Sequence, residues 1–231
     1  MSRRETSGQG GDAAPDVLAG QAIYSPAVLR VYDLLVLGLS NRLVWRCPTA
    51  ELSRLYDRNV SRRHLDVGVG TGLLLDRARW PVPDPQITLV DLNRHSLAAA
   101  GRRIRRLSPR AIVANILEPL PVAIGPFESV GLCYLLHCLP GRMEDKAIAF
   151  DHLRPALAPG ARVFGATLVA DAPRSPAARR LAQLYNRKGI FSNADDTATE
   201  LDRQLRLRFE EVQVRLCGTV ALFEARSPDR R

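Results

Sequence analysis

A glycine-rich turn follows a short apolar segment in the stretch HLDVGVGTGLLLD, residues 64–76. Three of five consecutive positions in that turn are glycine, at Gly68, Gly70 and Gly72. Glycine adopts positive φ at little steric cost and lets a ligand approach the main chain closely. In open α/β sheets, ligands bind beyond the carboxyl ends of the strands. We therefore place the end of the first strand at Val67 and expect a binding site in the turn after it.

Apolar strands alternate with helical segments along the rest of the chain. This alternation predicts an α/β fold with a parallel sheet and helices on both faces. The last two strands are joined by Cys217, Gly218 and Thr219, which predicts an antiparallel hairpin at the sheet edge. Strands are expected within 63–70, 85–92, 110–117, 128–139, 159–171 and 209–226, and helices over 95–107, 144–157 and, in two pieces, 175–207.

The chain of 231 residues divides into three expected regions. Residues 1–16 are polar and predict a flexible tail. Residues 17–60 carry apolar side chains at helical spacing, which predicts a helical cap. Residues 61–231 are expected to form the ligand-binding domain, and the total length suits one large domain with such a cap.

The net charge of +9 comes mainly from arginine, which supplies 31 of the 33 basic residues. The arginines are spread over helical stretches and both termini, whereas a nucleic-acid binder more often shows a basic stripe with interleaved aromatic residues. A solvated arginine-rich surface is therefore expected, nucleic acid is disfavoured as a partner, and an anionic partner stays open.

The four cysteines are scattered without a CxxC pair, which argues against a zinc site and a disulfide framework and favours the cytoplasm. No run approaches the roughly 18 apolar residues that span a membrane, so membrane insertion is not expected. The first 16 residues lack the apolar stretch of a secretory signal. Association into a homodimer is left open.

The position of Asp66 identifies the kind of ligand. A dinucleotide fingerprint, G-x-G-x-x-G, would need a third glycine where the chain has Leu73, and a carboxylate would repel a pyrophosphate. A ligand with a cationic group suits this turn better. S-adenosylmethionine has an ammonium group for Asp66, and Gly68 and Gly70 let it approach the main chain.

A second acid supports the same ligand. Asp91 ends the next expected strand, 23 residues after Gly68, near the offset of a ribose-binding acid in nucleotide-binding folds. Asp91 would accept hydrogen bonds from the ribose hydroxyls, and Leu92 would pack on the adenine ring.

Six motifs in order, LDVGVGTG, LVDLN, ANILEPLP, VGLCYLLHCL, LAPGARVF and GTVALFEA, resemble those of class I S-adenosylmethionine-dependent methyltransferases. The resemblance runs from about residue 60 to the C-terminus. It implies a Rossmann-like seven-stranded sheet of order 3-2-1-4-5-7-6 with the seventh strand antiparallel, and S-adenosylhomocysteine as the product. The stretch YDLLVLGLSNRLVWR is loosely similar to the cap of quinone-biosynthesis methyltransferases.

The resemblance also implies roles for three further residues. Asn115 stands where the family usually has an acid that meets the adenine amino group, and an amide oxygen can still accept that hydrogen bond. The backbone of Ile116 would serve an adenine ring nitrogen. The backbone of Cys133, at the end of the fourth strand, would lie beside the methionine moiety.

Methyl transfer requires a positioned acceptor and, for an alcohol or ammonium acceptor, removal of a proton. His137 follows the fourth strand and is the candidate general base, because the unperturbed pKa of histidine suits proton transfer near neutrality. A structural role for His137, capping a helix or binding a backbone carbonyl, is the alternative. His64, His95 and His152 are interpreted as surface residues.

Residues 175–193 are expected to form a lid over the acceptor side of the pocket, with Gly189 as a hinge. An apolar face with a hinge suits closure that excludes water from the reaction. Candidate substrate-contacting side chains are aromatic, with two in the cap and two in the lid: Tyr24, Tyr32, Tyr185 and Phe191.

The function that these features favour is methyl transfer from S-adenosylmethionine to a small, partly apolar metabolite in a pocket. No cluster of carboxylates suggests a metal site. Two alternatives remain: an RNA or protein methyltransferase that uses the basic surface, and a protein that binds S-adenosylmethionine without transferring methyl. The sequence does not identify the acceptor or the atom that is methylated.

Overall fold

A computed structural model describes residues 40–121 and 124–229 of the chain. The predicted tail, residues 1–16, and most of the predicted cap, residues 17–60, lie outside the described residues. The expectations for Tyr24 and Tyr32 therefore lie outside them as well.

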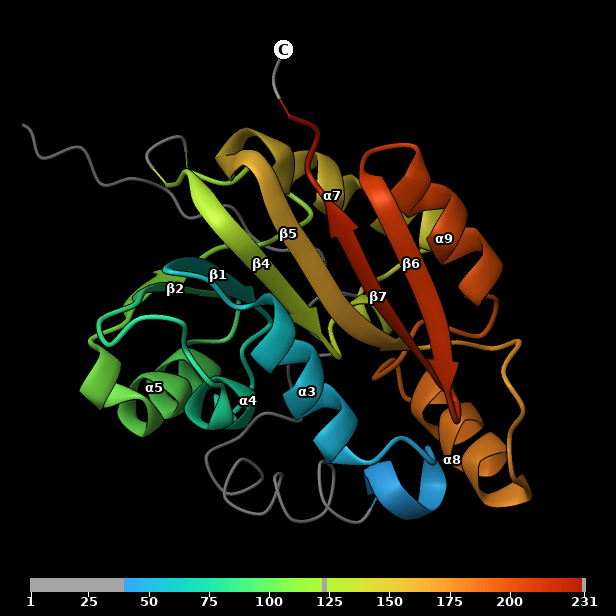
Figure 1. The fold of residues 1–231 in the computed structure, drawn as a ribbon. Coiled ribbons are helices and arrows are strands. Elements are labelled where there is room, and N and C mark those ends of the chain that lie inside the picture. The colour runs from blue at the N-terminus through green and yellow to red at the C-terminus, as the bar shows by residue number, and fades with distance from the viewer. Residues whose placement is uncertain (1–39, 122–123, 230–231) are drawn as a thin grey trace, which may run out of the picture.

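Seven strands form one mixed sheet of order β3-β2-β1-β4-β5-β7-β6, which confirms the predicted order (Figure 1). The strands from β1 to β5 pair in parallel, and β7 is antiparallel to both of its neighbours. The strands are β1 (Arg63–Val67), β2 (Gln86–Asp91), β3 (Arg110–Val113), β4 (Phe127–Cys133), β5 (Leu157–Leu168), β6 (Glu210–Cys217) and β7 (Val220–Arg226).

Three of the helices begin after residues whose side chains satisfy the first backbone N–H groups. The side chains of Asn93, Ser175 and Thr197 accept hydrogen bonds from the first turns of α5, α8 and α9, respectively. The α-helices are α3 (Thr49–Asn59), α4 (Leu73–Arg77), α5 (Arg94–Arg103), α6 (Met143–Lys146), α7 (Ile148–Leu153), α8 (Pro176–Arg187) and α9 (Ala198–Arg206), and the short 3-10 helices are η2 (Arg105–Leu107), η3 (Leu136–Cys138) and η4 (Arg154–Ala156).

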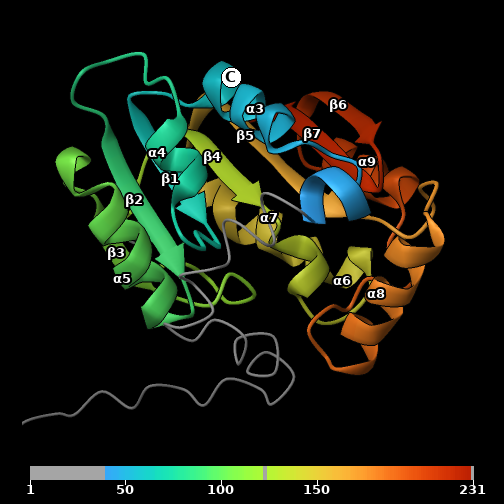
Figure 2. The ribbon, with the colours of Figure 1, turned by 90° about the horizontal axis from the view of Figure 1, so that it is seen from below.

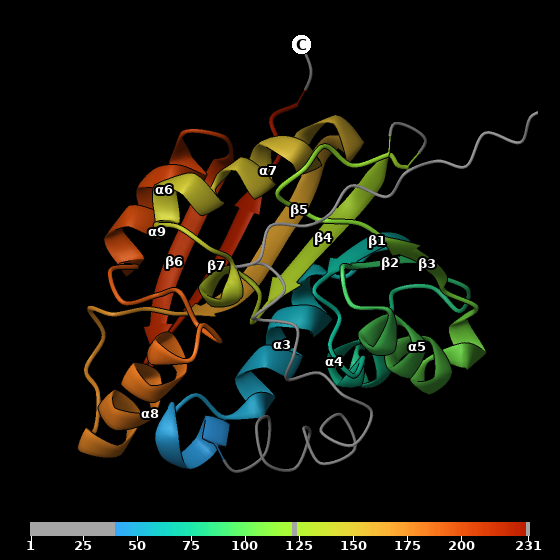
Figure 3. The same cartoon turned by 180° about the vertical axis from the view of Figure 1, so that it is seen from behind.

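The sheet separates two hydrophobic clusters. Successive side chains of a strand point to opposite faces, so Leu65 and Val67 of β1 join the cluster under α6, α7 and α9. The other cluster includes side chains of α3, α4, α5 and α8 together with Phe164 of β5. Figure 1 shows α3 in front of the sheet, Figure 3 shows α6 and α7 from behind, and Figure 2 shows the layers from below. The prediction of helices on both faces is confirmed.

Several elements differ in extent from the sequence-based expectation. The strand expected over 110–117 ends at Val113, because Asn115 starts a turn in which its side-chain oxygen accepts from the N–H of Leu117 at 3.1 Å. The helix expected over 144–157 is divided into α6, α7 and η4, and Pro155 lies in the last of these.

Among the described residues, no helix has both the length and the apolar character needed to cross a bilayer.

Candidate functional site

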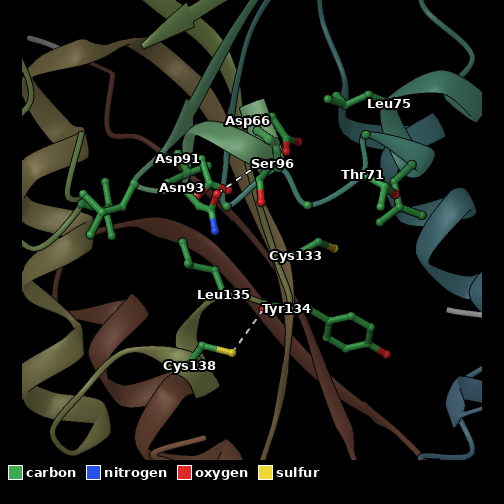
Figure 4. A pocket seen from close by; sticks show the side chains of 18 of the residues that line it. Asp66, Thr71, Leu75, Asp91, Asn93, Ser96, Cys133, Tyr134, Leu135 and Cys138 are labelled. Carbon is green, nitrogen blue, oxygen red and sulfur yellow. Dashed lines mark hydrogen bonds between the residues drawn. The ribbon is translucent and has the colours of Figure 1, made fainter. Parts of the chain in front are cut away.

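A pocket opens at the carboxyl ends of β1, β2 and β4, where the strand order reverses direction on either side of β1 (Figure 4). This is the position at which open α/β sheets bind ligands. The pocket holds about 1100 Å³ of empty space, a figure that includes its open mouth. All eight residues expected to bind the cofactor line it: Asp66, Gly68, Gly70, Asp91, Leu92, Asn115, Ile116 and Cys133.

The glycine turn has the conformation that its sequence suggests. Gly68, Gly70 and Gly72 have φ values of 73°, 52° and 73°, in the left-handed region that favours glycine. The N–H of Gly68 donates to the carbonyl of Val90 at 2.9 Å, which joins the turn to β2. A Cβ added at Gly70 would meet no atom within 4 Å. The turn therefore presents bare main chain to open space in the pocket.

Asp66 lies at the base of this pocket and is only 3% exposed. Its Oδ2 accepts a hydrogen bond from the hydroxyl of Tyr56 at 2.8 Å and lies 3.3 Å from Nε2 of His64. His64 is fully buried, so the interpretation of this histidine as a surface residue is wrong. The reason is alternation along β1, which puts residues 64 and 66 on the same face of the sheet.

Asp91 occupies the end of β2 and accepts a hydrogen bond from the N–H of Asn93 at 2.8 Å. Burial raises the pKa of Asp91 to about 6, although hydrogen bonds from the backbone of Asn93, Val69 and Gly70 oppose the shift. The group is therefore a carboxylate at pH 7 and above, placed beside the glycine turn as an acceptor for hydroxyl groups.

The amide of Asn115 takes part in the turn after β3. Its Oδ1 accepts from Leu117, and its Nδ2 donates to Oε1 of Glu118 at 3.1 Å. Ile116 is 4% exposed, and its carbonyl lies 3.0 Å from Nδ1 of His152. The side chain of Asn115 thus has local partners, and its oxygen has one further lone pair for a ligand.

The opposite wall of the pocket follows β4. In Figure 4, Tyr134, Leu135 and Cys138 lie across the pocket from Asp66 and Asp91. Tyr134 has a positive φ of 59°, which is uncommon for a non-glycine residue, and its N–H donates to the carbonyl of Ala166 at 2.7 Å. The wall is mainly apolar, with Leu139 and Pro140 completing it.

Several lining residues were not identified from the sequence. Tyr56 comes from α3 in the cap region, and no local pattern marks it as a pocket residue. Tyr134 directly follows the fourth strand, and that position could have marked it. Asn93 and Ser96 lie at the start of α5, where the predicted helix begins.

His137, the candidate base, lies in η3 behind the pocket wall and is not among the lining residues. It is 4% exposed, and its Nδ1 accepts from the N–H of Leu168 at 3.5 Å and lies 3.4 Å from Oγ1 of Thr167. Burial and the nearby Lys146 ammonium lower the pKa of His137 to about 3. The imidazole is therefore a weak base that packs in the core.

The expected lid contains α8 and the segment that follows it. The ring of Phe191 lies 4.9 Å from that of Tyr185, 4.7 Å from that of His137 and 6.2 Å from that of Trp45. Tyr185 and Phe191 therefore pack on one another and on His137. Neither side chain lines the pocket. Gly189 has a φ of 66° just after α8.

The chain after Phe191 is fixed to the core by polar contacts. The N–H of Ser192 donates to the carbonyl of His137 at 2.8 Å. Nζ of Lys146 binds both the carbonyl of Ser192 and Oδ2 of Asp196 at 2.5 Å, and both charged side chains are almost completely buried. Any movement about Gly189 would thus involve α8 rather than the segment after it.

The pocket fits S-adenosylmethionine by the chemistry of its groups. A buried carboxylate, Asp66, suits a cationic group, Asp91 suits hydroxyls, and the open space at Gly70 suits a ligand that lies against the main chain. Within residues 40–121 and 124–229, no group of three His, Cys, Asp or Glu side chains is arranged to hold a metal ion.

Comparisons with known proteins agree with this fit. Residues 65–163 match a family described as a methyltransferase domain. The chain is 41% identical over 214 residues to demethylluteothin O-methyltransferase of Streptomyces thioluteus, covering 92% of this chain and 93% of the relative. It is 37% identical over 214 residues to the physcion biosynthesis cluster O-methyltransferase of Aspergillus chevalieri, covering 90% and 95%.

A similar solved structure is that of the N-methyltransferase NodS from Bradyrhizobium japonicum in complex with S-adenosylhomocysteine, with a TM-score of 0.66, 16% identity, and coverage of 94% of this chain and all of that one. This likeness shows the shared fold. Taken with the two relatives, it places the chain in the family of class I S-adenosylmethionine-dependent methyltransferases. The chain is an enzyme of that family, and S-adenosylmethionine is its methyl donor.

Proposed function

We propose that the enzyme methylates an acidic hydroxyl group, a phenol or an enol, on a small and partly apolar metabolite. The observation that carries this proposal is the pocket itself. Its glycine turn and two carboxylates face a mainly apolar wall formed by Tyr134, Leu135, Leu139 and Pro140. Oxygen as the accepting atom is supported by the names of the two relatives, which are both O-methyltransferases.

We infer that the hydroxyl is acidic because His137 is poorly placed to act as a general base. With a pKa of about 3 and a position behind the pocket wall, this imidazole is poorly suited to remove a proton from an alkyl alcohol. A phenol or enol loses its proton far more readily. S-adenosylmethionine, when bound, would supply an electrophilic methyl group to the acceptor oxygen, with the C–S bonding pair left on sulfur and the hydroxyl proton released to solvent.

The residues of this chain contribute by binding and orientation. We assign the methionine part of the donor to Asp66, Gly68 and Gly70, and its ribose to Asp91. Leu92, Asn115, Ile116 and the backbone of Cys133 would surround the adenine and the remainder of the donor.

The acceptor side is assigned to Tyr134 and the apolar residues after it. Phe191 and Tyr185 then support this wall through His137, whose ring lies 5.7 Å from that of Tyr134. Tyr185 and Phe191, which we expected to contact the acceptor from a lid, would then act on the acceptor indirectly, by supporting this wall.

We place the reaction in the cytoplasm, a proposal supported by four cysteines that are all free thiols. A homodimer stays an untested prediction, which sedimentation of the purified chain would examine.

The test is a transfer assay with isotopically labelled S-adenosylmethionine and three sets of small acceptors: phenols and enols, alkyl alcohols, and amines. Mass spectrometry should find the label on members of the first set, and the Asp91→Ala enzyme should serve as the low-activity control. Transfer confined to amines would contradict oxygen as the acceptor. Transfer only to RNA or protein added in parallel would contradict a small metabolite.

A further inference from the structure

A series of hydrogen bonds leads from the pocket carboxylate Asp66 back along the sheet. His64 precedes it by two residues on the same face of β1, with Nε2 3.3 Å from Oδ2 of Asp66. Nδ1 of His64 lies 2.8 Å from Oγ of Ser129 on β4. That oxygen lies 2.7 Å from Oγ of Ser61 and accepts from the N–H of Ser61 at 3.0 Å. This series of hydrogen bonds thus ends at Ser61, just before the amino end of β1.

The chemistry of Asp66 fixes the direction of its hydrogen bond with His64. The carboxylate of Asp66 can only accept, so Nε2 of His64 carries the proton and donates to it. Nδ1 of His64 is then an acceptor, and the hydroxyl of Ser129 donates to it. Ser129 accepts in turn from the N–H of Ser61, and the hydroxyl of Ser61 donates to the carbonyl of Arg63 at 3.2 Å. The tautomer with the proton on Nε2 satisfies the contacts of His64 with both Asp66 and Ser129.

The imidazole ring is held by aromatic neighbours on several sides. His64 has no exposed surface, and its ring stacks on Phe164 at 5.8 Å with an interplanar angle of 26°. Trp80 and Tyr56 meet it edge-on at 5.5 and 6.4 Å. Rotation of the ring would break these contacts as well as the hydrogen bonds, so Nε2 stays aimed at Asp66.

Both donors to the carboxylate reach the same oxygen. Tyr56 and His64 both bind Oδ2 of Asp66, at 2.8 and 3.3 Å. A carboxylate held at one oxygen by two buried donors cannot turn about its terminal bond without losing both. The carboxylate of Asp66, which lines the pocket, is thereby held in one orientation.

We propose that His64 is a positioning residue that orients Asp66 toward the cationic amino group of the methyl donor. The inference rests on the assignment of Asp66 to that amino group. It extends the binding site to the buried residues His64 and Ser129 and the half-buried Ser61, none of which lines the pocket.

Two ligands separate positioning from a general structural effect. S-adenosylhomocysteine carries the amino group, and 5′-methylthioadenosine keeps the adenosine and the sulfur but lacks the amino acid part. We expect His64→Phe, which keeps a flat ring without hydrogen-bonding atoms, to raise the Kd of S-adenosylhomocysteine about tenfold in calorimetry. The Kd of 5′-methylthioadenosine should change less than about twofold.

His64→Gln is the matched control, because its Nε2 can replace the donor to Asp66, and it should recover most of the affinity for S-adenosylhomocysteine. Should His64→Phe not fold, His64→Asn makes the same comparison, since its amide reaches toward Ser129 and not toward Asp66. Equal weakening of both ligands, or no weakening of either by a folded variant, would overturn the inference. Asp66→Asn tests the underlying assignment separately: if it leaves S-adenosylhomocysteine affinity unchanged, the assignment of Asp66 fails, and with it the basis for His64.

Discussion

The phenolic hydroxyl of Tyr134 donates a hydrogen bond of 2.9 Å to Oδ1 of Asn41, a residue with no exposed surface. The bond joins the segment that precedes α3 to the residue directly after β4, at the wall of the pocket. The two residues are 93 positions apart. The cap region is thereby attached to the site at the point where we place the acceptor.

Removal of this hydroxyl in Tyr134→Phe should lower the free energy of unfolding by about 1–2 kcal/mol, because a buried acceptor loses a partner. The affinity for S-adenosylhomocysteine should change little, and the KM of the acceptor should rise. Urea denaturation and steady-state kinetics measure the three quantities. A variant with wild-type stability and unchanged acceptor KM would show that the bond has no such role.

The glycines of the turn are expected to differ in how substitution by alanine affects stability and ligand binding. Gly70→Ala projects a methyl group into open pocket space at a φ of 52°, so it should cost about 1–2 kcal/mol of stability and weaken S-adenosylhomocysteine binding strongly. Gly72→Ala is the matched control, because its Cβ would lie 2.9 Å from Cα of Ala100. It should destabilise the fold more than Gly70→Ala does. Thermal unfolding with and without ligand would compare the two, and wild-type affinity in Gly70→Ala would contradict the placement of the ligand.

The buried imidazole of His137 makes stability depend on pH. The pKa of this group falls from 6.5 in the unfolded chain to about 3 in the folded one. Below pH 6.5 the unfolded chain binds a proton that the folded chain does not, so the free energy of unfolding should drop by roughly 1 kcal/mol per pH unit between about 6 and 4. His137→Asn keeps an acceptor-bearing side chain without this titration. Urea unfolding at several pH values should show a shallower slope for the variant, and equal slopes would contradict the shift.

The support that Phe191 gives to the pocket wall can be separated from cofactor binding. Phe191→Ala should raise the acceptor KM or lower kcat, because the ring packs on His137, which in turn contacts Tyr134. It should leave the affinity for S-adenosylhomocysteine nearly unchanged. Tyr185→Phe keeps the neighbouring ring and should behave like the wild type. A large loss of cofactor affinity in Phe191→Ala would place this residue in the donor site instead.

The parts of the site that the sequence predicted are those determined locally. The strand that ends at Val67, the glycines with positive φ and the acid that ends β2 each follow from a few neighbouring residues. The strand order was implied by the family resemblance. A turn sequence constrains its own backbone, so its identification needs no knowledge of distant segments.

The residues that sequence analysis missed or misplaced are set by packing between distant segments. Tyr56 reaches Asp66 because α3 packs across β4 and β5, and the burial of His64 depends on Phe164 and Trp80. His137 follows a strand end, as expected, but the turn of η3 directs it into the core rather than to the pocket. Strand alternation places His64 on the same face as Asp66, but no local pattern encodes which distant side chains pack on them.

The central claim is that the pocket binds the methyl donor through the carboxylates of Asp66 and Asp91. Substitution of Asp91 tests this claim most directly. Calorimetric titration with S-adenosylhomocysteine at pH 8 should show one site per chain, and Asp91→Ala should lose about 1.5–3 kcal/mol of binding free energy, the range for hydrogen bonds to a charged group. Because the pKa of Asp91 is about 6, the wild-type affinity should also fall as the pH drops below 6, whereas the variant should show no inflection there. Equal affinities for the wild type and Asp91→Ala at pH 8 would contradict the account.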